Sequence, residues 1–384
     1  MNITAENLEL ISVLLFFSLI ALRLYLKRKE LKIEKVIIFE YSKKYTEKIN
    51  EIVRKHPRFF KILGIIALIS APIMMFVGIY YIISSLIFFK PSVALVLPSV
   101  SNFKYPGPVI SVPFWIWIIA IFVIVFSHES MHALIAASEG IKTKRYGLLY
   151  LLAIPIGAFV DIEERRIEKL ETKKKVKIFA AGSLGNALAF FLFIIILIVF
   201  SQIINQLLES KGIWFNNTAP DSPADKVGLK GIIVRINNTT IKDIYDLRDF
   251  LTKTKPNTTV IIETTEGKYE LMLSEKDNIS YIGIVGVKNY IVYKGTNQPA
   301  SENIITIINY SFTIIQWVAF LSLGVAIANM LPIIPLDGGL IVREIFRKKF
   351  GKRGEKLSNL ISSIFIILLL SSLFLSSLTL RAAP

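Results

Sequence analysis

The sequence predicts a polytopic α-helical membrane protein with about six spans and one small extracytoplasmic α+β domain. Of its 384 residues, 53% are hydrophobic and only 19% are charged, whereas an ordinary soluble domain has about 25% charged residues. Long uncharged runs alternate with dense clusters of charge, and one long charge-balanced segment interrupts this alternation. Such a distribution excludes a simple soluble globule and a disordered chain.

Six segments are apolar enough to cross a bilayer as helices, which takes about 20 residues. The first lacks the basic start and the small-residue cleavage site of a signal peptide, so we expect it to be retained. The candidate spans are residues 8–26, 60–89, 112–137, 178–208, 303–328 and 357–379.

The basic residues between the spans predict how the chain is oriented. Lys and Arg number twelve in residues 27–61, two in 90–111, ten in 138–177, which includes the run Lys173 to Lys175, and seven in 343–356. Cytoplasmic loops carry an excess of Lys and Arg, so we place the three basic segments inside the cell. Both chain ends, the 90–111 loop and the long segment 209–302 then lie outside.

Composition also narrows the chemistry. The formal net charge is +16, but the basic residues flank apolar runs and lack interleaved aromatic residues, so we expect the lipid bilayer as a partner and no nucleic acid. The absence of cysteine excludes disulfides, a Cys zinc site and a Cys nucleophile. The remaining ligands for a transition metal are carboxylates and three histidines, of which His56 lies in a basic His-Pro-Arg loop and is interpreted as solvated.

Residues 209–302 have the character of a small soluble domain. Twelve basic residues balance twelve acidic ones, and three short β-type runs are separated by turns. Between the runs, Ile244, Leu247, Phe250 and Leu251 recur at helical spacing. We expect a single α+β domain of this length, present in one copy.

One motif carries recognisable chemistry. Residues 128–132 read His-Glu-Ser-Met-His, and between Ile116 and Ala137 Glu129 is the only Asp, Glu, Lys or Arg. Two histidines four residues apart lie on one helical face and can bind the same ion. Zinc acidifies a bound water, whose proton the neighbouring carboxylate can take. Two histidines packing between helices are the alternative, but they leave ionisable groups in hydrocarbon without compensation.

Catalytic zinc needs a third protein ligand, and no further histidine is suitable. Asp337 is the only acidic residue between Asn303 and Arg343, and it follows a segment with two prolines. A broken helix at membrane depth typically lines a site. Taken alone, Asp337 fits an ordinary helix-terminal Asp equally well. The topology favours ligation, because it places His128 and Asp337 toward the same, cytoplasmic side.

With these residues, the sequence resembles the site-2 protease family of intramembrane zinc metalloproteases. Its two characteristic motifs are HExxH, here at 128–132, and NxxPxxxxDG, here at 329–338. The resemblance implies that His128, His132 and Asp337 hold one zinc ion and that Glu129 is the catalytic acid and base. A Gly-x-x-x-Asn element also matches at Gly182 to Asn186, and the resemblance implies that Asn186 and Asn329 position the substrate.

Two further segments carry weaker resemblance. Residues 155–164 are similar to a segment that follows HExxH in archaeal members, where it forms a re-entrant β-hairpin that could align a substrate strand; an interfacial loop is the alternative. Residues 221–238 resemble the Ser-Pro-Ala turn, the Gly-Leu pair and the following strand of a protease-associated PDZ domain, although the usual Pro-Gly-Asp is missing. Peptide capture and steric gating are both open interpretations for this PDZ-like domain.

We therefore expect an enzyme that hydrolyses peptide bonds in or near transmembrane segments of membrane-anchored substrates. A zinc transporter would need polar residues along both halves of the spans, and the outer halves contain few. A non-catalytic adaptor that binds through the PDZ-like domain would not need Glu129. The expected organisation is residues 1–111, accessory spans; 112–208, first half of the protease core; 209–302, PDZ-like domain; 303–340, second half of the core; and 341–384, C-terminal loop and span.

Overall fold

The computed structural model of the protein describes residues 5–29, 31–34, 37–90, 93–100, 105, 107–141, 143–151, 154–162 and 164–382. The chain forms two compact units. The first joins Met1–Ile196 to Phe312–Pro384, and the second is Leu197–Ser311. The sequence-based boundaries at 209 and 302 lie inside the second unit, because the divisions between the units fall within two long helices.

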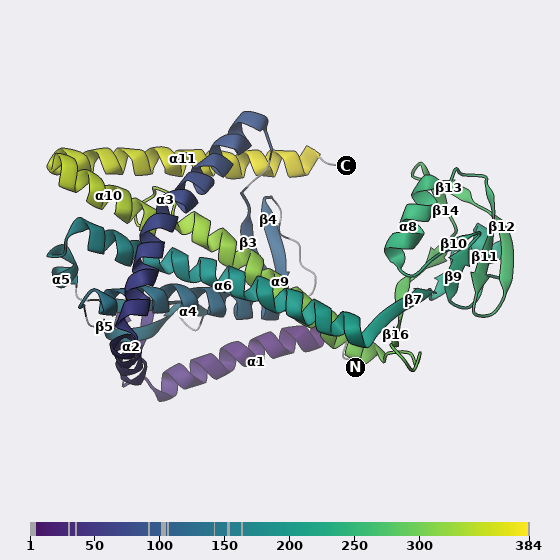
Figure 1. The fold of residues 1–384 in the computed structure, drawn as a ribbon, viewed down its shortest axis with the longest axis horizontal. Helices are drawn as coiled ribbons and strands as arrows, with labels where there is room; N and C mark the ends of the chain where they lie inside the picture. The colour runs from purple at the N-terminus through teal and green to yellow at the C-terminus, as the bar shows by residue number, and fades with distance from the viewer. Residues whose placement is uncertain are drawn as a thin grey trace. The chain divides into compact units, whose positions relative to one another are not determined.

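Six long helices each contain a stretch apolar enough to cross a membrane (Figure 1). They confirm the predicted polytopic helical membrane protein. Large apolar side chains such as Phe76, Ile195 and Phe320 are more than half exposed on them, as expected for surfaces that lipid covers. The helices are α1 (Ala5–Leu26), α3 (Pro57–Phe88), α4 (Phe114–Ser138), α6 (Thr172–Leu207), α9 (Glu302–Asn329) and α11 (Lys352–Ala382).

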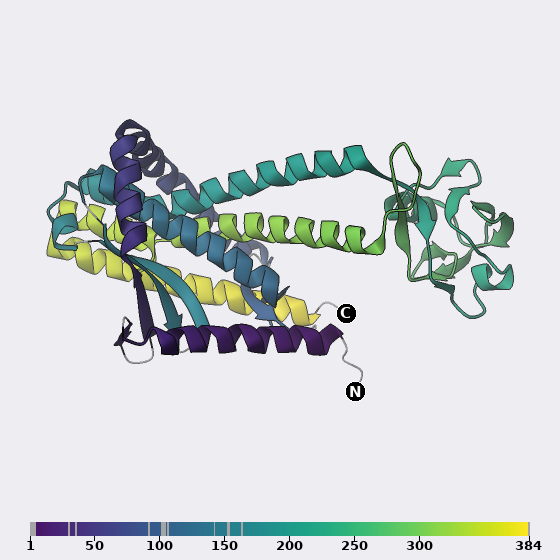
Figure 2. The ribbon, with the colours of Figure 1, turned by 90° about the horizontal axis from the view of Figure 1, so that it is seen from below.

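The beginning of α3 and the ends of α4 and α10 follow from local sequence. Pro57 is the first residue of α3, where its missing N–H costs no helical hydrogen bond. After α4 the chain turns at Gly140, whose φ of 89° suits glycine. The short helix α10 (Asp337–Phe350) ends at Gly351, also with a positive φ, and α11 follows directly. In both ribbon views α10 lies against the beginning of α11 (Figures 1 and 2).

The core of the first unit gathers small and medium side chains from four of these helices. Ala67 and Ala71 of α3 pack with Ile135 of α4, Ala181 of α6 and Ile341 of α10 in one buried cluster. Small residues allow helix backbones to approach closely. The cluster therefore places α4, α6 and α10 side by side.

An antiparallel sheet of four strands packs against α4. The sheet has the order β1 (Lys32–Glu34), β2 (Ile37–Ser42), β5 (Thr143–Leu151) and β6 (Ile154–Ile162). In Figure 2 its strands reach from α4 toward α1. Most of the segment that resembles an archaeal hairpin thus lies in β6, which pairs with β5 from Leu151 opposite Ile154 to Thr143 opposite Ile162.

The basic segment 27–61 is more structured than the charge count alone indicated. It contains β1, β2 and helix α2 (Lys43–Lys55). Strand β2 pairs antiparallel with β5, with Phe39 opposite Leu149. The remaining elements of this unit are α5 (Glu164–Glu168) and a parallel pair, β3 (Leu95–Ser99) and β4 (Val109–Pro113).

A buried carboxylate on β2 fastens α1 to the sheet. Glu40 is 8% exposed and accepts hydrogen bonds from Arg23 at 2.8 Å, Lys27 at 2.7 Å and the Tyr150 hydroxyl at 2.9 Å. Burial by itself raises the pKa of the Glu40 carboxyl, but the three donors outweigh burial and hold that pKa below its usual value. The ionised form of Glu40 is therefore part of the folded structure.

The second unit is a small α+β domain with an antiparallel sheet of the order β12-β11-β9-β7-β16, to which β10 adds on β9. Helix α8 begins at the N-cap Asp243, whose carboxylate accepts from the amides of Tyr245 and Asp246. Its core is built from fully buried aliphatic residues such as Ile233, Ile262 and Leu273. The elements are β7 (Leu208–Trp214), β8 (Asn217–Thr218), α7 (Pro223–Lys226), β9 (Ile233–Ile236), β10 (Thr239–Thr240), α8 (Ile244–Lys253), β11 (Thr259–Thr264), β12 (Lys268–Met272), β13 (Ser274–Lys276), β14 (Ile279–Tyr281), β15 (Ile284–Val285) and β16 (Lys288–Tyr293).

Replacing the buried Glu40 carboxylate should lower the free energy of unfolding at neutral pH but not in acid. Glu40→Gln is expected to lower the free energy of unfolding by about 1–2 kcal/mol at pH 7, a modest loss because Arg23 and Lys27 are about half exposed. A carboxyl with a lowered folded pKa stabilises above its unfolded pKa, about 4.3, and loses that effect as the pH falls further. Thermal unfolding of both proteins in detergent should therefore converge below about pH 4; a difference that stays constant from pH 7 to pH 3.5 contradicts this.

Candidate metal centre

Three side chains that are far apart in the sequence converge between α4 and α10. His128 and His132 stand one turn apart on α4, with their Nε2 atoms 3.2 Å from each other. Asp337, the first residue of α10, has Oδ2 3.5 Å from His128 Nε2 and Oδ1 3.5 Å from His132 Nε2. All three side chains are at least 85% buried, at 14%, 14% and 12% exposed. The sequence-predicted ligand set is therefore brought together.

The residues of this cluster fit a zinc ion. Tetrahedral ligands about 2.0–2.1 Å from zinc lie about 3.3 Å from one another, close to the 3.2 and 3.5 Å separations seen here. Asp337 Oδ2 is buried, and the structure gives it no hydrogen-bond partner among the residues it describes. Two imidazoles and one carboxylate are also the donor types of catalytic zinc sites. We conclude that His128, His132 and Asp337 could hold one zinc ion.

The imidazole of His132 is oriented by the backbone of α6. Its Nδ1 atom lies 2.7 Å from the carbonyl oxygen of Ile178. Because a carbonyl can only accept, Nδ1 carries the proton, and in the neutral imidazole Nε2 is left with a lone pair. Metal-binding histidines usually donate their second ring N–H in this way. The Nε2 atom of His132 is thus prepared for an ion.

The imidazole of His128 is oriented by Asn186 and Ser127. The fully buried Asn186 side-chain amide lies between the Ser127 hydroxyl, at 2.8 Å, and His128 Nδ1, at 3.2 Å. An imidazole that binds metal through Nε2 carries its proton on Nδ1 and needs an acceptor there. The structure places Asn186 Oδ1 at Ser127 and Nδ2 at His128. Exchanging the oxygen and nitrogen of the amide, which have nearly the same shape, turns Oδ1 toward His128 and Nδ2 toward Ser127, whose hydroxyl donates to the Ile124 carbonyl at 3.0 Å.

Two glycines of α6 allow the helix to approach the motif. A Cβ atom at Gly182 would overlap the imidazoles of both His128 and His132. A Cβ atom at Gly185 would overlap the backbone carbonyl of Ser127. Gly182 and Gly185 are therefore required by the closeness of α6 to α4.

The tight loop between α9 and α10 fixes Asp337. A Cβ atom at Gly338 or Gly339 would overlap the backbone of residues 330–334, so the loop can close directly onto the first turn of α10. The Ile334 amide donates to the Ser362 hydroxyl of α11 at 2.9 Å. Asn329, the last residue of α9, is half-buried eight residues before Asp337. Its expected role toward a substrate stays a prediction.

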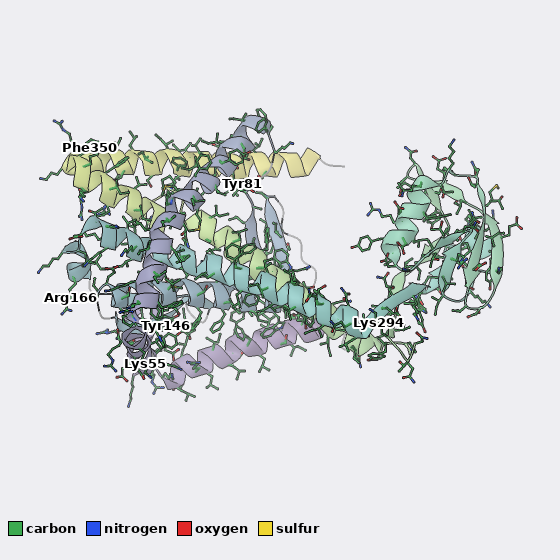
Figure 3. The ribbon with its side chains drawn as sticks, viewed as in Figure 1. Lys55, Tyr81, Tyr146, Arg166, Lys294 and Phe350 are labelled. Carbon is green, nitrogen blue, oxygen red and sulfur yellow. The ribbon has the colours of Figure 1, made fainter. Side chains whose placement is uncertain are left out.

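Glu129 lies beside the ligand face of α4. It is half-buried and close enough to His132 and Tyr146 to interact with both electrostatically. Tyr146 of β5 packs against Tyr45 of α2 in a tilted contact with 4.6 Å between ring centroids, and the Tyr45 hydroxyl lies 3.4 Å from the Ser130 hydroxyl. Figure 3 shows Tyr146 where β5, α2 and α4 come together. No pattern in the sequence indicated this tyrosine pair, because Tyr45 and Tyr146 are distant from each other along the chain.

The fold and the three-residue cluster define a multi-pass membrane protein with a candidate metal centre inside its helices. Comparison with known proteins agrees with this class. Residues 116–371, more than half of the chain, match the family model described as Peptidase family M50. The chain therefore belongs to Peptidase family M50, the family of the site-2 proteases. An uncharacterized protein of Methanocaldococcus jannaschii is 28% identical over 285 residues, which are 73% of this chain and 70% of the relative.

Filling the space at Gly182 should prevent metal binding. We expect Gly182→Ala to lose most of its zinc, because the added Cβ would overlap both imidazoles. Gly324→Ala is a matched control in α9, where an added Cβ meets no atom within 4 Å. Elemental analysis of both purified variants measures the outcome. A Gly182→Ala protein with as much zinc as Gly324→Ala would show that the helices are not this close.

The amide orientation at Asn186 can be tested by substitution. Asn186→Ala removes the partner of His128 and should weaken zinc binding about 10–100-fold. Asn186→Asp keeps an oxygen acceptor for His128 Nδ1–H and should bind zinc much more tightly than Asn186→Ala. Chelator competition in detergent measures both affinities. If Asn186→Asp binds zinc as weakly as Asn186→Ala, the amide does not accept from His128.

Proposed function

We propose that this member of Peptidase family M50 is an intramembrane zinc metalloprotease that hydrolyses peptide bonds in or near transmembrane segments. One observation carries the proposal. Two imidazoles from one apolar helix and a carboxylate from another lie at the separations of tetrahedral zinc ligands, with Glu129 directly beside them. A zinc ion held there would polarise the scissile carbonyl and acidify a water molecule.

The chain's own residues supply the rest of the chemistry. Glu129 takes the proton of the attacking water and returns it to the leaving amine. Asn186, whose amide is fully buried between Ser127 and His128, orients a proposed ligand, and its expected role toward a substrate stays a prediction. Asn329 is the second candidate for positioning the substrate backbone.

A substrate helix must unwind before cleavage, because its peptide bonds are hydrogen-bonded within the helix. The edge of β6 supports a way to bind the unwound segment. Within the residues that the structure describes, β6 pairs with β5 on one side only, so its other edge can accept an added strand. Beside it lies a cavity of about 690 Å³ between α1 and α4. Its walls include Phe16, Ile20, Phe122, Val125, Phe126, Leu148 and Gly157.

We further propose that the second unit is a PDZ-like domain outside the cell and that the metal centre lies nearer the cytoplasmic side. The positive-inside distribution of Lys and Arg supports this orientation. The Ser-Pro-Ala turn supports the PDZ assignment: Ser222 caps α7 and accepts from the Asp225 amide at 3.3 Å. The domain either captures a peptide or gates access to the site. We propose a membrane-anchored protein substrate as the partner of the whole chain.

Removing the proposed base tests the function. Glu129→Gln should bind zinc like the natural protein but cleave a reporter with a single transmembrane segment at least 10²–10⁴-fold more slowly. Cleavage in proteoliposomes and zinc content by elemental analysis are measured on the same preparation. Unchanged cleavage by Glu129→Gln would show that Glu129 is not the base. A natural protein that binds zinc and never cleaves would favour a transporter or an adaptor.

A further inference from the structure

Two buried carboxylates are bound by lysines at the beginning of α6. Lys177 donates to Glu139 at 2.6 Å, and Lys175 donates to Glu344 at 2.9 Å. Glu139 lies seven residues after His132, just past the end of α4. Glu344 lies seven residues after Asp337, within α10. Both α4 and α10 carry proposed metal ligands, and the chain of each is thus joined to α6 by a carboxylate seven residues after a proposed ligand.

Glu344 has the denser set of partners. Besides Lys175, its Oε1 accepts from the Thr172 hydroxyl at 3.1 Å, and its Oε2 accepts from Arg347 at 2.8 Å. Lys175 is 5% exposed and Glu344 is 8% exposed. Burial by itself raises the pKa of the Glu344 carboxyl, but Lys175, Arg347 and Thr172 hold it below its usual value. The carboxylate therefore stays ionised and keeps Lys175 at the interface.

These contacts lie in line with the metal centre. Seven residues are about two helical turns, or about 10.5 Å along the axis, and bring the chain back to the same face. On α10, Asp337, Ile341 and Glu344 form one stripe, and Ile341 packs in the core cluster with Val176 and Ile178 of α6. On α6, Lys175 and Gly182 are also seven residues apart, and Gly182 adjoins both imidazoles. The ion pair and the metal centre are the two ends of one helix interface.

We propose that Lys175 and Lys177 are positioning residues that hold α10 and α4 in register on α6, so that Asp337 meets the two histidines. This inference rests on the proposed zinc site. The sequence indicates Lys175 and Lys177 only as cytoplasmic charge. The proposal gives both lysines a role in positioning the proposed metal ligands. The two pairs are not equivalent, because His132 and His128 are also held directly by the Ile178 carbonyl and by Asn186.

The position of Asp337 depends more strongly on its ion pair, the one between Glu344 and Lys175. Among the residues that the structure describes, the hydrogen bonds and ion pairs from α10 to α6 all end on Glu344. Loss of this carboxylate would let α10 slide or rotate on α6 and carry Asp337 with it. We therefore expect Glu344→Gln to weaken zinc binding about 10-fold, although residue 344 touches no proposed ligand.

The control for Glu344→Gln is a substitution of Glu40, a second buried carboxylate with similar hydrogen-bond partners. Glu40 is also 8% exposed and also accepts from two basic side chains and one hydroxyl, but it joins α1 to the sheet. Zinc affinity of the full chain is measured in detergent by chelator competition for the natural protein, Glu344→Gln and Glu40→Gln. The visible spectrum of the Co²⁺-loaded proteins reports the coordination geometry of the folded fraction.

We expect Glu344→Gln to bind zinc about 10-fold more weakly and to alter the Co²⁺ spectrum, with Glu40→Gln within about 2-fold of the natural protein. Equal affinities in all three proteins, or equal weakening in both variants, would overturn the proposal. If Glu344→Gln does not fold, Thr172→Val removes one hydrogen bond to Glu344 and should weaken zinc binding by a smaller factor; no change overturns the proposal. Absence of zinc binding by the natural protein instead refutes the proposed function itself.

Discussion

The cost of placing ionisable side chains among apolar helices constrains the whole first unit. An acidic or basic residue near the centre of a spanning helix costs about 2.5–3.5 kcal/mol on insertion scales. Helix α4 nevertheless carries His128, Glu129 and His132 in one turn, and α10 brings Asp337 against them. Two imidazole Nδ1 atoms are satisfied by Ile178 and Asn186. What remains are two Nε2 atoms and a carboxylate, a combination that a divalent cation stabilises and that a closed apolar core would not tolerate.

Helix α6 is the element on which the centre is assembled. Its buried residues include five small ones, Ala180, Ala181, Gly182, Ser183 and Gly185. Small residues give up apolar burial, but they let the backbone of α6 reach the imidazoles and offer a carbonyl to one of them. At its beginning the same helix carries Lys175 and Lys177, which bind the carboxylates that follow the ligand positions on α10 and α4. Small residues near the imidazoles and ion pairs at the beginning of α6 therefore both hold α6 against α4 and α10.

The parts of this structure that the sequence could predict are those with a local pattern. Spans follow from uncharged length, and the two histidines follow from their spacing of four residues on one helix. Strand β2 was not predicted, because six residues inside a basic segment become a strand only by pairing with β5, about a hundred positions later. The contact of Asn186 with Ser127 and His128 likewise depends on how α6 crosses α4. Sequence spacing indicates which residues share a helix face, but only packing determines what that face meets.

The geometry of α4 also shows how the candidate metal centre and the cavity between α1 and α4 use different faces of one helix. Successive helical residues rotate by about 100°, so Glu129 stands on the same stripe as Phe122, Val125 and Phe126, at spacings of seven, four and three residues. These three side chains line the cavity between α1 and α4. The histidines lie on the neighbouring stripe, which α6 and α10 cover. One helix thus turns its proposed metal ligands toward packed neighbours, while the stripe that contains Glu129 continues along the residues that line the cavity.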